Sequence, residues 1–228
     1  MRLVSILGDS VSTFEGYNPK EYAVFYNQGM QAVNALKSVY DTWWSQVIRA
    51  LHAYLCVNDA YSGSRVSGRE FPSAECDERL RNLRTEEYDP DMILVYLGFN
   101  DFGYGVPVTG GKGFFSRKDP DCFESAYDRM LKGLKRYYPS SLIVCGTLLR
   151  TDMKGENGWK FPEHFGGTAL EEYNEAIKRV VRKNTCFLAD LSGTGIRYMT
   201  LDGSHPTAEG HRTFAEVWIR CLRELDLI

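Results

Sequence analysis

The chain has 228 residues, 43% of them hydrophobic, and its 27 lysines and arginines against 30 aspartates and glutamates give a net charge of −3. This size and composition are typical of a globular protein with a substantial core. The nearly balanced charge and the lack of a basic stripe argue against nucleic-acid binding. No apolar stretch reaches the roughly 18 residues that cross a membrane, so we expect no membrane insertion.

The first predicted strand, residues 2–7, is apolar and leads directly into Gly8-Asp9-Ser10. A strand that begins so close to Met1 leaves no room for a signal peptide, so the sequence as it stands predicts a cytoplasmic protein. A natural leader replaced by an engineered Met is the alternative.

An aromatic-rich loop over residues 11–40 comes next, and its length and many rings predict a functional rather than a disordered segment. Asp41 or Thr42 could cap the following helix, residues 43–51, in which apolar side chains recur at helical spacing. A second strand around residues 55–57 then leads into a turn that contains glycine.

A third strand, residues 92–97, ends in Gly98-Phe99-Asn100-Asp101, and the glycine-rich loop from Phe102 to Asp119 predicts a mobile lid. The remaining pattern predicts helices over residues 123–134, 170–181 and 211–222, strands over 142–147 and 186–191, and an aromatic loop over 150–167. Apolar strands that alternate with amphipathic helices are typical of a parallel sheet buried on both faces. We therefore predict one α/β domain, residues 1–228, built as a three-layer α/β/α sandwich.

Ser10 follows a strand, the position at which parallel α/β sheets bind ligands, and the segment 202–206 near the other end contains Asp202 and His205. A serine hydroxyl is a poor nucleophile, so an imidazole must take its proton, and a carboxylate must hold that imidazole in the right tautomer. The spacing predicts nucleophilic acyl chemistry with Ser10, Asp202 and His205 as the catalytic residues.

Attack by a serine creates an oxyanion, which needs preorganised hydrogen-bond donors. The backbone N–H groups of Ser10 and Gly63 and the side-chain amide of Asn100 could supply them, because each follows a predicted strand. Gly68 is the alternative to Gly63 in the same loop.

Together these residues resemble the SGNH (GDSL-type) serine hydrolase and esterase family, whose signature comprises a Ser in Gly-Asp-Ser, a Gly, an Asn in Gly-x-Asn-Asp and a His in Asp-x-x-His. Ser10, Gly63, Asn100 and His205 match the signature in that order, and the resemblance spans residues 8–206. It implies a flavodoxin-like, mostly parallel five-stranded sheet, a nucleophile at Ser10, an oxyanion hole of Ser10, Gly63 and Asn100, and Asp202 in the triad. It also implies chemistry without a metal or cofactor.

Each motif also has a simpler interpretation as a turn, with Ser10 as a helix cap and Asp202 as an Asx-turn residue. Their occurrence in order, each at a strand exit, favours catalysis instead. His164 is a rival base, but it lacks a neighbouring Asp in the motif arrangement. The six cysteines fall singly, which favours free thiols and gives no zinc motif.

Aromatic residues of the loops predict the walls of a substrate cleft, which suits sugar rings or a planar acyl group better than a long aliphatic chain. The predicted contacts are Phe14, Tyr17, Phe99, Trp159 and Phe161.

The sequence therefore predicts a serine esterase that hydrolyses a short acyl ester, acetyl above all, on a small-molecule or saccharide substrate. The alternatives are a lysophospholipase or thioesterase, an acyltransferase that uses the same triad, and a non-catalytic carbohydrate-binding protein on the same fold.

Overall fold

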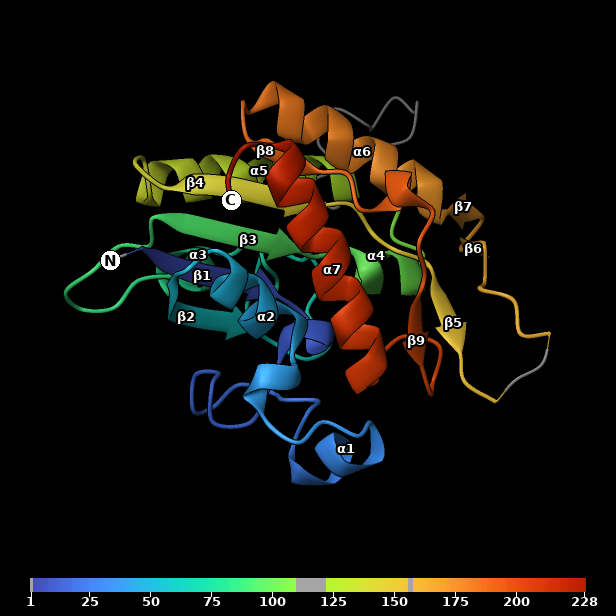
Figure 1. Cartoon of the computed structure of the whole chain (residues 1–228). Helices are drawn as coiled ribbons and strands as arrows, with labels where there is room; N and C mark the ends of the chain where they lie inside the picture. Colours follow the sequence, from blue (N-terminus) through green and yellow to red (C-terminus); the bar gives the residue numbers. More distant parts are fainter. Residues whose placement is uncertain (1, 110–121, 156–157) are drawn as a thin grey trace.

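The computed structural model describes residues 2–109, 122–155 and 158–228. Its centre is a five-stranded, fully parallel sheet in the order β2-β1-β3-β4-β8 (Figure 1). The strands are β1 (Leu3–Gly8), β2 (Tyr54–Ala60), β3 (Met92–Tyr96), β4 (Leu142–Gly146) and β8 (Phe187–Ala189). The predicted fold class is thus confirmed, including the five-stranded sheet.

The inner strands β1 and β3 are mostly apolar because both faces of the sheet are covered. Every residue of β1 and β3 is buried. The one polar side chain within β1 beyond its glycine end, Ser5, donates from Oγ to the Leu83 carbonyl at 2.7 Å and accepts from Val57 N. Its burial therefore leaves the hydroxyl satisfied.

Helices cover both faces of the sheet and make the three layers (Figure 1). On one face α2 (Trp43–Ala50) packs against α7 (Ala208–Glu224), and on the other α5 (Phe123–Tyr137) packs against α3 (Asp77–Arg81) and α6 (Leu170–Lys183). Each of the longer helices buries one apolar stripe, as the sequence periodicity predicted.

The structure shows which of the two predicted residues, Asp41 or Thr42, caps the N-terminus of α2. Thr42 is the N-cap, and its Oγ1 accepts from Ser45 N at 3.4 Å. Asp41 instead ends the short 3-10 helix η2 (Val39–Asp41) and accepts from the backbone N–H groups of Lys37 and Ser38.

Several short elements lie in segments for which the sequence predicted neither a helix nor a strand. They are η1 (Ser10–Ser12), α1 (Gln28–Val33), α4 (Phe99–Gly103), β5 (Thr151–Met153), β6 (His164–Phe165), β7 (Thr168–Ala169), η4 (Ser192–Thr194) and β9 (Tyr198–Thr200). β5 pairs with β9 in parallel and β6 with β7 antiparallel. These elements are too short to show a periodicity. The predicted loops over residues 11–40 and 150–167 were wrong where α1, β5 and β6 form.

The predicted lid, Phe102 to Asp119, falls partly outside the described residues, which leave out 110–121. At its start the prediction was wrong, because Phe102 and Gly103 complete α4 rather than begin a loop.

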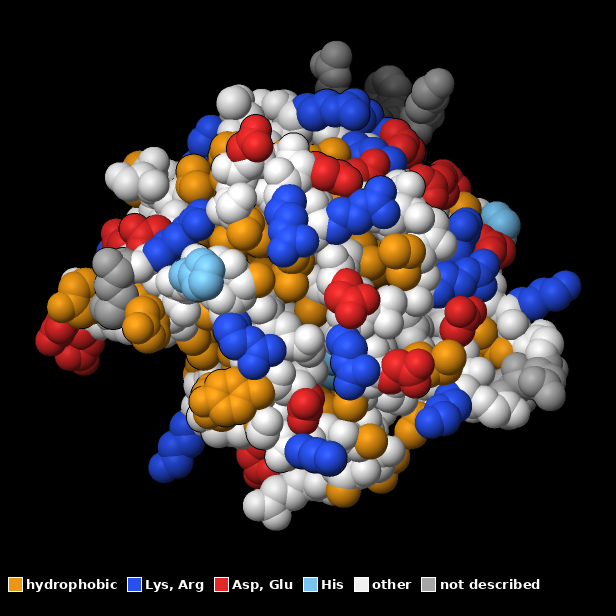
Figure 2. Space-filling view, viewed as in Figure 1, with side chains coloured by type: hydrophobic (Ala, Val, Ile, Leu, Met, Phe, Trp, Pro, Cys, Tyr) orange, Lys and Arg blue, Asp and Glu red, His pale blue; other side chains and the backbone are white. Residues whose placement is uncertain are grey.

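The surface and the cysteines agree with the composition. Figure 2 shows lysine and arginine side chains interspersed with acidic ones on the face in view, rather than gathered into a basic patch. All six cysteines are unpaired, four of them buried. Among the described residues, no helix has the length and apolarity needed to span a membrane.

Candidate active site

Ser10 lies just beyond the end of β1, where the chain turns sharply. The Asp9 side chain caps η1 by accepting from Val11 N at 3.0 Å, so Ser10 becomes the first residue of that 3-10 turn. The turn is so tight that a Cβ on Gly8 would lie 2.7 Å from the Ser12 side chain. Glycine is therefore required before the nucleophile candidate, and Ser10 itself is 7% exposed.

Ser10, His205 and Asp202 form a continuous hydrogen-bonded chain. His205 Nε2 lies 2.8 Å from Ser10 Oγ, and His205 Nδ1 lies 2.7 Å from Asp202 Oδ2. The hydrogen bonds that Asp202 accepts from His205 and Ser204 outweigh burial and hold its pKa well below the usual value. Because Asp202 is ionised, Nδ1 carries the proton, and Nε2 is left to accept from the serine.

Phe25 lies flat on the imidazole of His205. The ring centroids are 3.4 Å apart and the planes differ by 7°. Two hydrogen bonds hold the loop that carries Phe25. Phe25 N donates to Thr13 Oγ1, and Tyr26 Oη donates to the carbonyl of Pro206, next to His205. Sequence reasoning did not single out Phe25, since nothing local indicates a partner 180 residues away.

Asn100 lies in the first turn of α4, directly after β3. Gly98, with φ of 125°, is the N-cap that turns the chain, and a side chain there would press on Phe123. Asn100 Nδ2 donates to the Ser64 carbonyl at 3.0 Å and to Asp9 Oδ2 at 3.3 Å. The predicted amide donor is thus linked to the turn of Gly63 and to the residue before Ser10.

The alternative glycine is engaged elsewhere. Gly68 N donates to Glu75 Oε1 at 3.1 Å. Both glycines are exposed, but a Cβ added at Gly63, which has a φ of 82°, would meet no atom within 4 Å, whereas one at Gly68 would lie 3.4 Å from the Ser73 side chain. Gly63 is therefore the glycine with an open face.

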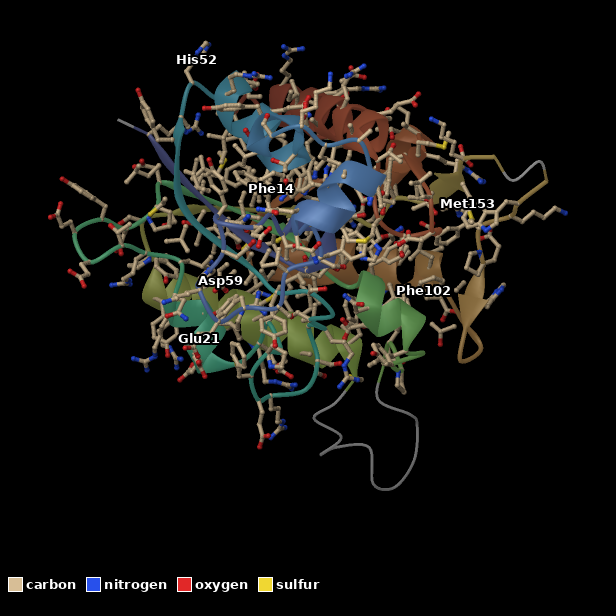
Figure 3. The ribbon with its side chains drawn as sticks, turned by 90° about the horizontal axis from the view of Figure 1, so that it is seen from below. Phe14, Glu21, His52, Asp59, Phe102 and Met153 are labelled. Carbon is tan, nitrogen blue, oxygen red and sulfur yellow. The ribbon has the colours of Figure 1, made fainter. Side chains whose placement is uncertain are left out.

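A buried arginine ties these segments together, and sequence reasoning missed it. Arg79 on α3 is fully buried and pairs with Asp59 of β2 at 2.7 Å (Asp59 is labelled in Figure 3). It also donates to Ser64 Oγ at 2.9 Å and to the carbonyls of Gly8 at 3.1 Å and Pro72 at 2.7 Å. One guanidinium thus fixes the ends of β1 and β2 and the turn after β2.

Two further carboxylates are buried beside the site, and neither has an ion-pair partner among the residues that the structure describes. Burial raises the pKa of Asp9 to about 6, and it raises that of Asp101 to about 6 as well. Asp101 accepts from Val66 N at 2.7 Å and from Ser67 N and Oγ at 3.0 and 2.7 Å. It therefore attaches α4 to the loop after Gly63.

A cavity of about 350 Å³ lies beside Asn100 and Asp202. Three of the five aromatic residues predicted to contact substrate line it, namely Phe99, Trp159 and Phe161. Phe14 and Tyr17 do not. Phe14, labelled in Figure 3, is a core residue with 6% exposure, and Tyr17 packs on Phe14 and on Trp44 of α2. The early part of the 11–40 loop thus packs onto the core, which the prediction for these two residues did not anticipate.

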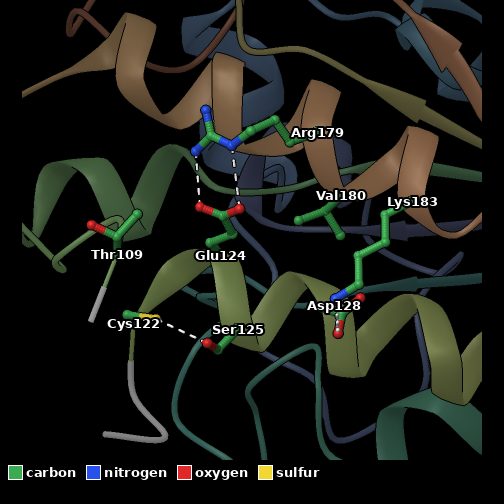
Figure 4. A pocket seen from close by; sticks show the side chains of 8 residues that line it. All are labelled: Thr109, Cys122, Glu124, Ser125, Asp128, Arg179, Val180 and Lys183. Carbon is green, nitrogen blue, oxygen red and sulfur yellow. Dashed lines mark hydrogen bonds and ion pairs between the residues drawn. The ribbon is translucent and has the colours of Figure 1, made fainter. Parts of the chain in front are cut away.

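Other candidates lie elsewhere. His164 is exposed in β6, where it pairs with Ala169, whereas His205 faces Ser10. A cavity of about 280 Å³ between α5 and α6 contains none of the predicted site residues, and its charges are paired as Arg179–Glu124 and Lys183–Asp128 (Figure 4). Within the described parts of the chain, no group of three or more His, Cys, Asp or Glu could hold a metal ion.

Comparison with known proteins gives a consistent picture. Residues 2–160 match the family model for GDSL-like lipase/acylhydrolase. A multidomain esterase of Ruminococcus flavefaciens is 28% identical over 141 residues, which are 59% of this chain and 16% of that protein. The match therefore covers less than a fifth of that relative's length.

Solved structures share the fold. A protein of Bacteroides uniformis assigned as a GDSL-like lipase is 26% identical, with a TM-score of 0.71 over 100% of this chain and 96% of that one. Another from Bacteroides ovatus has a TM-score of 0.73 at 23% identity, over 98% and 99% of the chains. A family two carbohydrate esterase of Clostridium thermocellum, solved with cellohexaose, has a TM-score of 0.57 at 18% identity, over 100% of this chain and 65% of that one.

Proposed function

This chain belongs to the GDSL-like lipase/acylhydrolase family, and from this we propose that it is an esterase. It removes short acyl groups, acetyl above all, from a carbohydrate through an acyl-enzyme at Ser10. The substrate proposal depends on one observation, the aromatic cavity of about 350 Å³ beside Asn100 and Asp202.

The triad geometry supports the reaction sequence. His205 Nε2 takes the Ser10 proton as Oγ attacks the ester carbonyl, and the same nitrogen then protonates the leaving alcohol. A water molecule, deprotonated in turn by His205, attacks the acyl-enzyme and releases the acid. Throughout, the ionised Asp202 holds Nδ1–H in place and stabilises the imidazolium.

The oxyanion would be met by Ser10 N, Gly63 N and Asn100 Nδ2. One of the two amide hydrogens of Asn100 is held by Ser64, and the other makes the longer contact, 3.3 Å, to Asp9. The oxyanion can take the place of Asp9 as the acceptor of this longer hydrogen bond. Each such donor typically contributes about 3 kcal/mol to transition-state stabilisation.

The walls of the cavity support a carbohydrate rather than a long-chain lipid. Phe99, Trp159 and Phe161 offer flat faces on which a sugar ring can lie, and Asp202, Ser204 and Asn100 add polar atoms. No Leu, Ile or Val is among the described residues that line it. A lysophospholipase or thioesterase would need such aliphatic side chains along its acyl channel.

The test is a set of initial rates on p-nitrophenyl acetate, butyrate and octanoate and on an O-acetylated xyloside, for the wild type and Ser10→Ala. We expect a sharp preference for acetyl, release of acetate from the sugar, and loss of turnover in the variant. A rate that rises towards octanoate would support the lipid alternative. Added alcohol acceptors that become acylated would show transfer instead of hydrolysis.

Absence of turnover on all four esters would contradict the proposed function. A binding protein on this fold would then still retain affinity for the deacetylated sugar, which calorimetry with Ser10→Ala can measure.

A further inference from the structure

A second cavity, of about 480 Å³, is lined by residues of the loop after β2 and by Tyr104. The two cavities meet near the end of α4, because its last residue, Gly103, lines the first cavity and the next residue, Tyr104, lines the second. Gly63 also lines the second cavity. If the carbonyl oxygen of the ester accepts from the Gly63 N–H, another part of the same substrate molecule can therefore reach into this cavity.

The guanidinium of Arg65 is the one positive charge among the described residues that line this cavity. It lies over the ring of Tyr104, 5.5 Å from the ring centroid. Within the described residues, no carboxylate lies within ion-pair distance of Arg65 and its guanidinium makes no hydrogen bond, although its charge acts on Asp101 from farther away. A half-buried guanidinium that lies over an aromatic ring and has no ion-pair partner in the described parts of the chain is suited to receive a planar anion.

Ser73 provides a second, independent indication. Its side chain is 6% exposed and lines the same cavity, yet its Oγ has no hydrogen-bond partner among the described residues. Buried hydroxyls are normally satisfied, and an exception at a cavity indicates a missing ligand or water. Arg65 therefore supplies the cationic fork of the cavity, and Ser73 adds a buried hydroxyl in its wall.

The walls of the cavity are held by the same contacts that hold the active site. Asp101 accepts from Val66 and Ser67, and Glu75 accepts from the N–H groups of Gly68 and Arg69. The loop that carries Arg65 is thus preorganised, which lowers the cost of ordering it around a ligand.

From these observations we propose that the cavity is a subsite for a carboxylate on the ester substrate, carried by a sugar acid unit that is the acylated sugar or its neighbour. This inference rests on the proposed function, and it narrows the substrate class to acidic saccharide esters. Glu70, an exposed carboxylate on the same wall, opposes such a ligand and so limits its affinity.

The test compares two sugars that differ only at C6, an O-acetylated methyl glucoside and the matching O-acetylated glucuronide. For the wild type we expect kcat/KM to be roughly tenfold or more higher on the glucuronide, as a charge-assisted pair gives. Arg65→Gln should bring the ratio close to one, and Glu70→Gln should raise it. Arg182→Gln, which removes one exposed charge at the far end of α6, is the matched control and should leave the ratio unchanged.

A third ester, an O-succinylated glucoside, distinguishes the two possible carriers of the carboxylate. A higher kcat/KM on the succinylated than on the acetylated glucoside, lost in Arg65→Gln, would show that the subsite binds a carboxylate of the acyl group. The carboxylate subsite would then be supported, with the acyl group as the carrier. Equal kcat/KM on all three esters, unchanged by Arg65→Gln, would overturn the subsite while the esterase function stood.

A binding measurement keeps the inference separate from catalysis. NMR titration with methyl glucuronide and methyl glucoside needs no ester and no turnover. We expect the glucuronide to bind the wild type roughly tenfold more tightly and to lose that advantage in Arg65→Gln. If no ester were hydrolysed, the proposed function would fail, and this titration alone would decide whether the cavity binds carboxylates.

Discussion

His205 is held on three sides, by Asp202 at Nδ1, by Ser10 at Nε2 and by Phe25 across its face. The first two contacts follow from the motif spacing, whereas the third depends on how the 11–40 loop folds back over the site. An aromatic face carries partial negative charge, so it both fixes the plane of the imidazole and favours the imidazolium formed during catalysis.

We therefore expect Phe25→Ala to lower kcat on p-nitrophenyl acetate roughly three- to tenfold, the range of a cation–π contribution of about 1 kcal/mol. KM should change less, because the ring acts on the base rather than on the substrate. Phe25→Tyr keeps an aromatic face against the imidazole and should retain most of the wild-type kcat. Tyr17→Ala, which removes another ring of the same loop away from His205, is the control. A drop in thermal stability with unchanged kcat would show that Phe25 is only a packing residue.

At the scale of elements, the carboxyl edge of the sheet is organised around one buried ion pair. Arg79 of α3 and Asp59 of β2 are both fully buried, and the arginine also satisfies acceptors on Gly8, Ser64 and Pro72. Burial raises the pKa of Asp59, and Arg79 opposes that shift. Removal of the cation would leave an uncompensated carboxylate inside the protein.

Arg79→Met should accordingly lower the free energy of unfolding by about 3–5 kcal/mol, measured by urea denaturation. The double variant Arg79→Met/Asp59→Leu should recover part of that loss, because it removes the orphaned charge. Arg81→Met, two residues along α3, removes an exposed pair with Asp77 and should cost about 1 kcal/mol or less. Equal destabilisation by the two single variants would contradict this role for the buried pair.

The sequence predicted the elements with a strong local signal. β3 and β4 are continuous apolar runs, and α5 and α6 carry clear apolar stripes, so their positions were predicted to within a few residues. β5 and β9 have three residues each and are stabilised by pairing with one another, each residue with a partner 47 positions away, which no local pattern reveals. The same applies to the site: motif spacing indicated the triad, but the places of Phe25 and Arg79 depend on tertiary contacts.

At the scale of the whole molecule, buried acidic groups are concentrated under the catalytic edge. Asp9, Asp59 and Asp101 all lie there, and burial raises the pKa of each. Charges in such positions lower stability at neutral pH, a cost that proteins commonly carry at functional sites. For Asp9, next to Ser10, that cost can be measured because it depends on pH.

The pKa of Asp9 in the folded protein, about 6, lies above the ordinary value of 3.8 that it regains on unfolding. Between those values the folded state binds more protons than the unfolded one. The stability that Asp9 contributes is therefore fully present below pH 3.8 and is lost as the pH rises through about 6. From pH 5 to 7.5 we expect the loss from Asp9 to be about 1 kcal/mol.

Asp9→Asn removes this titration. Urea denaturation should therefore show that the free energy of unfolding of the variant, relative to that of the wild type, is about 1 kcal/mol higher at pH 7.5 than at pH 5. Any fixed cost of the amide, such as a poorer contact with Asn100, is the same at both pH values and cancels in that comparison. Glu216→Gln, at an exposed position on α7, is the control and should follow the wild type. A constant difference between Asp9→Asn and the wild type would mean that Asp9 stays ionised in the folded protein over this range, with the Val11 N–H and the Asn100 amide together offsetting its burial.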